Sequence, residues 1–210
     1  VYSSADSGDN WSFPHGQIGM PYDLATHPNL MDFDGYSSTY NQIYYNTALA
    51  CSHLDENALL IGGLNLWRSN DGGASYLGVG GYIGGLPLMH VDLQEFRNYK
   101  TSPTTEEVWF SSDGGLNYST DWCNSHISLT KGIGAVNFWG LDQGWNDDII
   151  VGGRYHNGNG AYSDSYGPGT FLALGGGENA TGYVNYSPER KTYYSDIGGR
   201  IIPIASDDLV

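Results

Sequence analysis

Ser4-Ala5-Asp6-Ser7-Gly8-Asp9-Asn10-Trp11, Ser69-Asn70-Asp71-Gly72-Gly73-Ala74-Ser75-Tyr76 and Ser119-Thr120-Asp121-Trp122-Cys123-Asn124-Ser125 repeat one pattern. The pattern is Ser-x-Asp-x-Gly-x-(Ser/Thr/Asn)-aromatic, and we call each copy a box. Asp6 and Asp71 lie 65 residues apart, and Asp71 and Asp121 lie 50 apart. A four-stranded propeller blade takes about 40–50 residues, so the spacing allows one blade per box, with an insertion in the first interval. The sequence therefore predicts an all-β chain, a β-propeller of four-stranded antiparallel blades.

Each box has the chemistry of a tight turn. Ser and Asp side chains accept hydrogen bonds from nearby backbone N–H groups, and Gly adopts a positive φ at little cost. The closing aromatic residue starts the next strand and has a large apolar face to bury. We therefore expect structural roles, rather than catalysis or metal binding, for Ser4, Asp6, Gly8, Trp11, Ser69, Asp71, Gly73, Tyr76, Ser119 and Asp121. The third box lacks the Gly and the final aromatic residue, so we expect its turn to be distorted.

The composition also favours short strands. The chain has 31 Gly and 17 Tyr among 210 residues, which suits tight turns and aromatic layers between sheets. The best helical candidate, His90–Tyr99, is short. The predicted strands are Gln42–Tyr45, Ala58–Gly62, Leu64–Arg68, Glu107–Phe110, Ile149–Val151, Phe171–Leu174, Gly182–Tyr186, Thr192–Ser195 and Arg200–Ile204.

The length predicts about four to five blades in a single propeller segment covering residues 1–210. The approximate repeats are 1–54, 55–100, 101–145, 146–190 and an incomplete 191–210. Because the chain opens inside a box with no strand before it, we expect it to continue into further blades or other domains. The alternative is a small propeller that is complete in itself.

Charge and cysteine content limit the partners and the compartment. The net charge of −15 argues against binding to nucleic acid or to an anionic membrane. No apolar run is long enough to cross a bilayer. Cys51 and Cys123 allow one disulfide or two separate thiols. The expected location is secreted or at the cell surface, with a protein or glycan partner.

The boxes resemble the Asp-box, or bacterial neuraminidase repeat, of secreted propellers such as the sortilin-type and xyloglucanase-type proteins. The resemblance extends to Leu60–Ser69, to Val108–Asp121 and to His90-Val91-Asp92. It implies a non-catalytic binding or structural module that recognises a protein or a glycan. The alternative is a part of a xyloglucanase-like glycoside hydrolase.

Enzymatic chemistry has little support in the residues. A sialidase needs an arginine cluster for a carboxylate, and the five arginines here form no such motif. A glycoside hydrolase needs two carboxyl groups across the scissile bond. The candidates outside the boxes are Asp92, Asp142 and Asp196, together with Asp147 and Asp148. Each of them also fits an ordinary turn or strand, so we expect no enzymatic activity.

The candidate binding residues are aromatic or lie in a glycine-rich turn. Trp139, Trp145 and Tyr155 could stack on sugar rings, although aromatics at this density more often fill layers. The turn that holds His156 and Asn157 resembles an inner-strand turn of related propellers. His90 lies two residues before Asp92, but without a third ligand we predict no metal site. No cofactor is expected. Asp side chains and backbone carbonyl groups in glycine-rich turns can hold calcium, which is the alternative, but no EF-hand-like or nonapeptide ligand spacing occurs.

Overall fold

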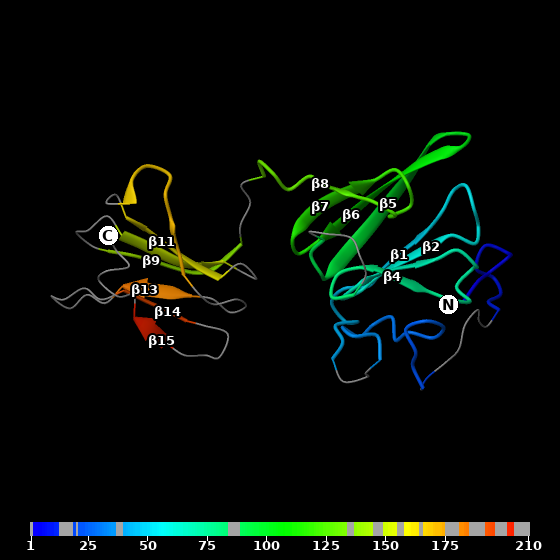
Figure 1. Ribbon diagram of the computed structural model, residues 1–210, viewed down its shortest axis with the longest axis horizontal. Coiled ribbons are helices and arrows are strands. Elements are labelled where there is room, and N and C mark those ends of the chain that lie inside the picture. Colours follow the sequence, from blue (N-terminus) through cyan, green and yellow to red (C-terminus); the bar gives the residue numbers. More distant parts are fainter. Residues whose placement is uncertain are drawn as a thin grey trace. The chain divides into compact units, whose positions relative to one another are not determined.

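The computed structural model describes residues 2–12, 19, 21–36, 40–83, 89–133, 137–144, 149–154, 158–163, 166–174, 181–184, 192–195 and 201–203. The chain forms two compact units, Val1–Gly132 and Ile133–Val210 (Figure 1). Apart from Tyr166, which has 3-10 conformation, the regular elements in the described ranges are strands, and every pair of neighbouring strands is antiparallel. Three sheets have four strands each, so the predictions of an all-β fold and of four-stranded antiparallel sheets are confirmed.

Unit 1 contains two sheets whose strands follow one another in chain order. The first sheet comprises β1 (Ala48–Cys51), β2 (Leu59–Gly62), β3 (Leu66–Ser69) and β4 (Leu77–Gly80). The second comprises β5 (Leu93–Ser102), β6 (Thr105–Ser112), β7 (Gly115–Ser119) and β8 (Ile127–Ser128). This up-and-down order is the strand order of a propeller blade.

Unit 2 contains the other two sheets. The third sheet comprises β9 (Phe138–Gln143), β10 (Ile149–Arg154), β11 (Gly158–Ser163) and β12 (Leu172–Ala173). The fourth comprises β13 (Gly182–Val184), β14 (Thr192–Ser195) and β15 (Ile201–Pro203).

The sheets recur with a regular period. Their first strands begin at Ala48, Leu93, Phe138 and Gly182, which lie 45, 45 and 44 residues apart. The predicted repeat boundaries at 54, 100, 145 and 190 lie 3 residues after β1, within β5, 2 residues after β9 and 6 residues after β13, and the repeats stay a prediction.

Two predicted elements are wrong. His90–Tyr99 was the best helical candidate, but it contains most of β5. A register shift between Leu93 and Glu95 lets Leu93 and Phe96 face the same side, so a bulged strand shows the three-residue spacing of a helix. The predicted strand Gln42–Tyr45 is a turn, closed by Tyr45 N donating to Gln42 O at 2.7 Å.

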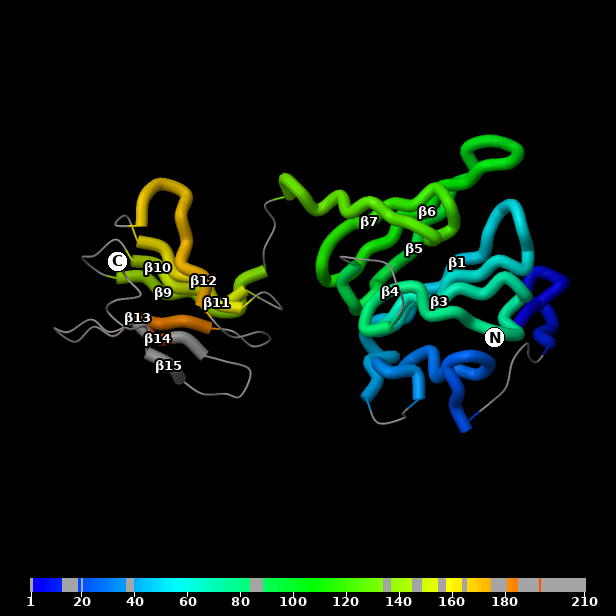
Figure 2. The backbone as a smooth tube through the Cα atoms, in the orientation of Figure 1, coloured from blue at the N-terminus to red at the C-terminus, as the bar shows by residue number. Residues whose placement is uncertain are grey.

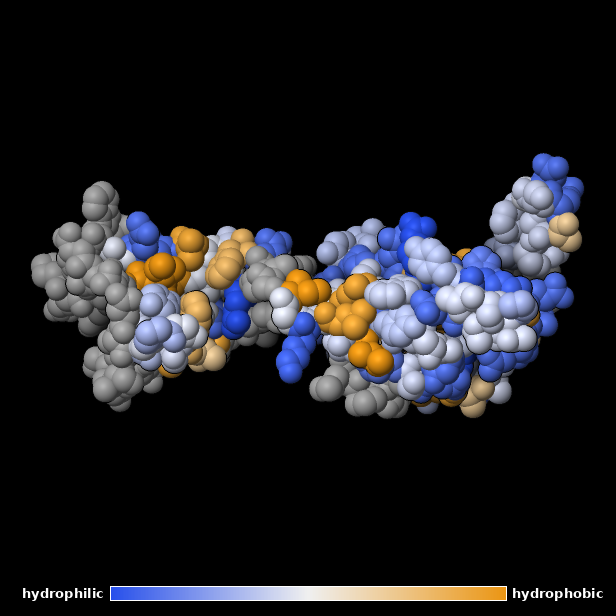
Figure 3. Space-filling view, turned by 90° about the horizontal axis from the view of Figure 1, so that it is seen from above, coloured by the Kyte–Doolittle hydropathy of each residue, from blue (hydrophilic) through white to orange (hydrophobic). Residues whose placement is uncertain are grey.

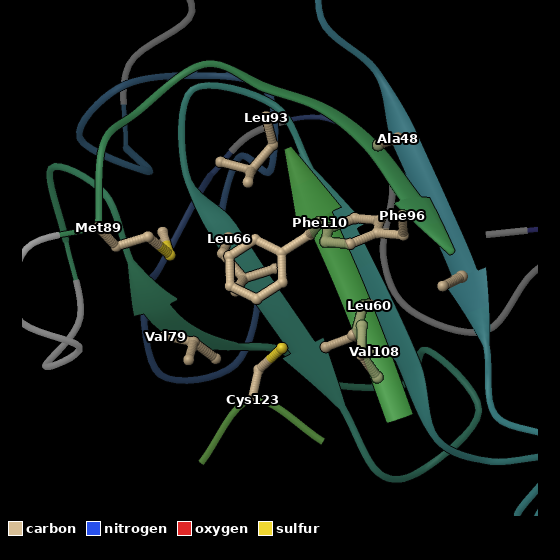
Figure 4. Close-up of a cluster of buried hydrophobic side chains, with 11 residues drawn as sticks. Ala48, Leu60, Leu66, Val79, Met89, Leu93, Phe96, Val108, Phe110 and Cys123 are labelled. Atoms are coloured by element: carbon tan, nitrogen blue, oxygen red, sulfur yellow. The ribbon is translucent and has the colours of Figure 1, made fainter. Parts of the chain in front are cut away.

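The main core of unit 1 lies between its two sheets (Figure 4). Figure 4 shows the ring of Phe110 at its centre, with the sulfur atoms of Met89 and Cys123 directed toward it. Leu60 and Leu66 contribute from the first sheet, and both are fully buried. Full burial of a side chain such as Phe110 stabilises the fold by about 1.5–3 kcal/mol.

The opposite face of the first sheet is covered by the chain that precedes it. Ile61, Trp67 and Tyr76 pack there against Leu24 and Leu30. Trp67 Nε1 also donates to Leu30 O at 3.0 Å. Figure 2 shows this N-terminal segment, in blue, along the sheet. In unit 2, a smaller core of Val151, Ala161 and Val184 joins the third and fourth sheets.

Candidate functional site

The three boxes form one kind of turn with the same hydrogen bonds. In the second box, Ser69 Oγ donates to Asp71 Oδ1 at 2.8 Å and accepts from Gly73 N at 2.9 Å. Asp71 also accepts from the backbone N and the hydroxyl of Ser75. Ser4 and Asp6 repeat these contacts around Gly8 and Asn10, and Ser119 and Asp121 repeat them around Cys123 and Ser125.

The third box is not distorted, which corrects the expectation drawn from its missing Gly. Trp122 and Cys123 adopt φ values of 55° and 59°, as Gly72 and Gly73 do with 69° and 92°. The left-handed conformation costs a residue with a Cβ about 1–2 kcal/mol. Here Cys123 places its thiol in the core, and His126 takes the place of the final aromatic, with its ring 6.1 Å from that of Phe110.

These contacts lower the pKa values of the three box carboxyl groups. Hydrogen bonds from Asn10 and Ser4 lower the pKa of Asp6 to about 2, and those from Ser75 and Ser69 lower the pKa of Asp71 to about 2. At Asp121, burial raises the pKa, but the hydrogen bonds from Ser125 and Ser119 outweigh it and the net pKa is lowered. Their side-chain oxygens are engaged within the turns. Tyr76 is buried as expected, whereas Trp11 is exposed.

The first catalytic candidate, Asp92, is buried at the start of the second sheet. It is 4% exposed and has a φ of 65°, and its Oδ1 accepts from Asn46 Nδ2 at 3.1 Å. Its backbone N donates to Leu64 O, and its backbone O accepts from Asp113 N. Asp92 thus links the two sheets of unit 1. The nearby His90 bonds to Val91 O through Nδ1.

The second catalytic candidate, Asp142, belongs to the other unit. Its Oδ2 accepts from Val184 N at 2.9 Å, which ties β9 to β13, and its Oδ1 accepts from Gln143 N. Asp196, the third candidate, lies outside the described residues, as do Asp147 and Asp148. Asp92 and Asp142 are therefore each engaged in fold contacts within their own unit.

Of the predicted binding residues, only Trp139 is described, and it is exposed on β9. Trp145, Tyr155, His156 and Asn157 lie outside the described residues. Among the residues described, no cluster of three or more His, Cys, Asp or Glu side chains could hold a metal ion. Cys51 is an exposed free thiol and Cys123 is a buried one.

Unit 1 also has a cluster of three aromatic rings that the sequence did not predict, and we call it the aromatic cage. Phe33 lies 5.8 Å from Tyr40 and 5.9 Å from Tyr82 between ring centroids, with interplanar angles of 86° and 85°. The three rings line an open groove of about 250 Å³. Phe33 is 39%, Tyr40 48% and Tyr82 58% exposed. Two rings therefore stand almost perpendicular to a third at the surface.

Two buried polar side chains hold the cage in place. Asn65, in the turn between β2 and β3, donates from Nδ2 to Phe33 O at 3.0 Å and accepts at Oδ1 from Tyr82 N at 2.7 Å. Asp32 accepts from Tyr40 N at 3.1 Å. Both Asn65 and Asp32 are 0% exposed. Each ring is therefore anchored through its own backbone by a buried side chain.

A local sequence signal for this region exists. The stretch Tyr36–Tyr45 contains Tyr36, Tyr40, Tyr44 and Tyr45, all of which are exposed. Tyrosine of this density on a polar segment is a sign of a binding surface, because Tyr buries a large area at little cost in conformational entropy. The contribution of Tyr82, from beyond β4, required the tertiary structure.

Unit 2 has a larger groove on its third sheet. Phe138, Leu141, Ile150 and Phe171 line about 400 Å³ there together with Arg154. Figure 3 shows apolar side chains gathered on the surface of this unit. Arg154 Nε donates to Gly158 O at 3.5 Å. The groove is the exposed face of an alternating sheet, and such a face favours packing against another apolar surface.

Comparisons with known proteins give a structural likeness alone. No family model matches the chain, and no curated protein matches it. Sixteen chains of solved structures do match. One of them, described as YCF48 bound to D1 peptide, is 13% identical with a TM-score of 0.35. The match covers 98% of this chain and 58% of that one, so this chain spans less than two thirds of its length. In the described part of the chain, no helix is long and apolar enough to cross a membrane.

Proposed function

We propose that this chain is a non-catalytic, protein-binding segment of an Asp-box β-propeller and that the aromatic cage is its ligand contact. The box turns close the hairpins between β3 and β4 and between β7 and β8, and the sheets recur at intervals of 44–45 residues. These features support the Asp-box propeller. We further propose, from the acidic composition, that the chain acts outside the cell or at its surface.

The single observation that carries the binding role is the anchoring of exposed rings by buried polar groups. Exposed aromatic residues enlarge the area that a partner can bury, and tyrosine is enriched at protein interfaces. Asn65 and Asp32 fix the backbone of all three rings before any partner arrives. Such preorganisation reduces the conformational entropy lost on binding.

The supporting observation is that two of the candidate catalytic carboxylates accept hydrogen bonds that hold the fold together. Asp92 accepts a hydrogen bond from a buried amide, and Asp142 caps a strand of the neighbouring sheet. A glycoside hydrolase requires one acid to donate a proton and a second carboxylate across the sugar. The glycoside hydrolase alternative stays a prediction without an observation in its favour.

An array of immobilised random peptides tests the binding role. The wild type is expected to bind a subset of peptides that Tyr82→Ser no longer binds, while Tyr99→Ser, at an exposed position on β5, binds them as before. Absence of binding to any peptide would contradict the proposal. Hydrolysis of xyloglucan that is lost in a folded Asp92→Asn variant would instead establish the alternative.

A further inference from the structure

We infer that the aromatic cage binds the ammonium group of a methylated lysine side chain in a basic segment of the partner protein. This inference rests on the proposed function and adds the chemistry of the ligand. It is carried by the arrangement of Phe33, Tyr40 and Tyr82 and by the charge of the chain.

The geometry of the rings suits a cation. An aromatic ring has a negative face and a positive edge, so a cation is attracted when it lies over a face within about 6 Å of the centroid. Tyr40 and Tyr82 are each nearly perpendicular to Phe33, and all three rings line the groove. Cages built from several aromatic rings are the arrangement that recognises quaternary ammonium groups.

The lining of the groove favours a methylated ammonium over an unmodified one. The described residues that line it are the three rings and no others. An unmodified ammonium needs hydrogen-bond acceptors to replace its water, whereas methyl groups spread the charge over an apolar surface. The cage is therefore expected to bind a trimethylated lysine more tightly than an unmodified lysine.

The negative charge of the chain favours a methylated lysine that lies within a basic peptide segment. The net charge is −15, and Asp32 and Asp34 flank Phe33 in the sequence. A negative field attracts a basic peptide and speeds its association. The same field repels the phosphate beside the ammonium of a choline lipid headgroup. A lysine in a basic protein segment is thus the favoured source of the ammonium group.

The groove is open to solvent, which suits the binding of the end of a side chain and not of a whole small molecule. Rings that remain 39–58% exposed cannot enclose a small free molecule. They can hold the tip of a side chain whose own backbone is bound outside the groove, for instance along the exposed tyrosines of Tyr36–Tyr45.

Calorimetric titration with three peptides tests the inference. The probes are one basic peptide with trimethyllysine, the same peptide with lysine, and the same peptide with a neutral isostere in which carbon replaces the ammonium nitrogen. The trimethyllysine peptide is expected to bind about tenfold more tightly than the neutral isostere, because only the ammonium group makes cation–π contacts with the rings.

Matched variants localise the effect. Tyr82→Leu and Tyr40→Leu keep apolar bulk but remove a ring, and each is expected to abolish the preference for the cation. Tyr99→Leu, at an exposed position on β5 that does not line the groove, should keep it. Circular dichroism confirms that the variants fold.

Two results would overturn the inference. Equal affinity for the trimethyllysine peptide and its neutral isostere would show an apolar groove without cation recognition. A cation preference that survives Tyr82→Leu and Tyr40→Leu would place the site elsewhere. Equal affinity leaves the proposed binding function standing, since that function fails if the random peptides of the array are not bound or if Tyr82→Ser binds them as the wild type does.

Discussion

At the scale of single residues, the second box shows how the side chains of Ser69, Asp71 and Ser75 close a turn without regular backbone hydrogen bonds between strands. Ser69 and Asp71 bind each other and the backbone two to four residues on, so the turn satisfies its own polar groups. The sequence predicts a structural role for these residues, because Ser and Asp side chains readily accept hydrogen bonds from nearby backbone N–H groups. It did not predict that Cys123 could replace the Gly, since that depends on the space in the core that the thiol fills.

The Asp71 carboxylate makes stability depend on pH. Its pKa is about 2 in the folded chain and 3.8 ordinarily, so its contribution is complete above about pH 4 and is lost as the pH falls toward 2. Asp71→Asn is expected to lower the free energy of unfolding at pH 7 by about 1 kcal/mol, a modest value because the side chain is exposed. The difference between wild type and variant in urea unfolding should shrink near pH 2. An undiminished difference at that pH would contradict the assignment, and Glu56→Gln, also exposed, is the control.

The two cysteines should differ in reactivity. Burial raises the pKa of Cys123 to about 12, whereas Cys51 is exposed. A thiol reagent added at neutral pH is expected to modify Cys51 and to leave Cys123 unmodified until the chain is unfolded, because the thiolate is the reactive form. Mass spectrometry of the labelled peptides measures this. Equal labelling of both residues in the folded chain would show that the core around Cys123 opens.

At the scale of elements, the side-chain hydrogen bonds between neighbouring strands and turns could not be predicted from the sequence. Glu106 on β6 accepts from the Ser52 hydroxyl and from His53 N, both in the turn after β1, and from Asn98 Nδ2 on β5. Asn65 joins Phe33 and Tyr82 in the same manner. The hydrogen-bonded partners lie 8 to 54 residues apart in the chain, so no local sequence pattern predicts that they meet. Strands such as β6 and β14 were predicted because their own residues alternate or are β-branched and aromatic.

Removal of the Glu106 carboxylate should weaken the contact between the sheets of unit 1. Glu106→Ala leaves the Ser52 hydroxyl and His53 N without their acceptor, and each unsatisfied group that is removed from water costs about 1–3 kcal/mol. We expect a loss of about 2–3 kcal/mol in the free energy of unfolding, measured in urea. Glu106→Gln keeps one acceptor oxygen and should lose less. Equal losses in the two variants would mean that shape, rather than hydrogen bonding, matters at this position.

At the scale of the molecule, the period of the sheets was predictable and the binding surface was not. Boxes at Asp71 and Asp121 gave the approximate repeat length, and the sheets begin 44–45 residues apart. The predicted binding residues came from tryptophans and a glycine-rich turn, of which Trp139 alone is described. The aromatic cage joins Phe33 and Tyr40 to Tyr82, which follows them only after the whole first sheet.

The central claim is that a rigid aromatic cage on a propeller-type sheet binds a protein ligand. Nuclear magnetic resonance of the chain with labelled aromatic rings, recorded before and after addition of a peptide selected on the array, tests it most directly. We predict that the largest shift changes belong to Phe33, Tyr40 and Tyr82. Changes concentrated instead on Trp139 and on Phe138 and Phe171 of the unit 2 groove would contradict the claim.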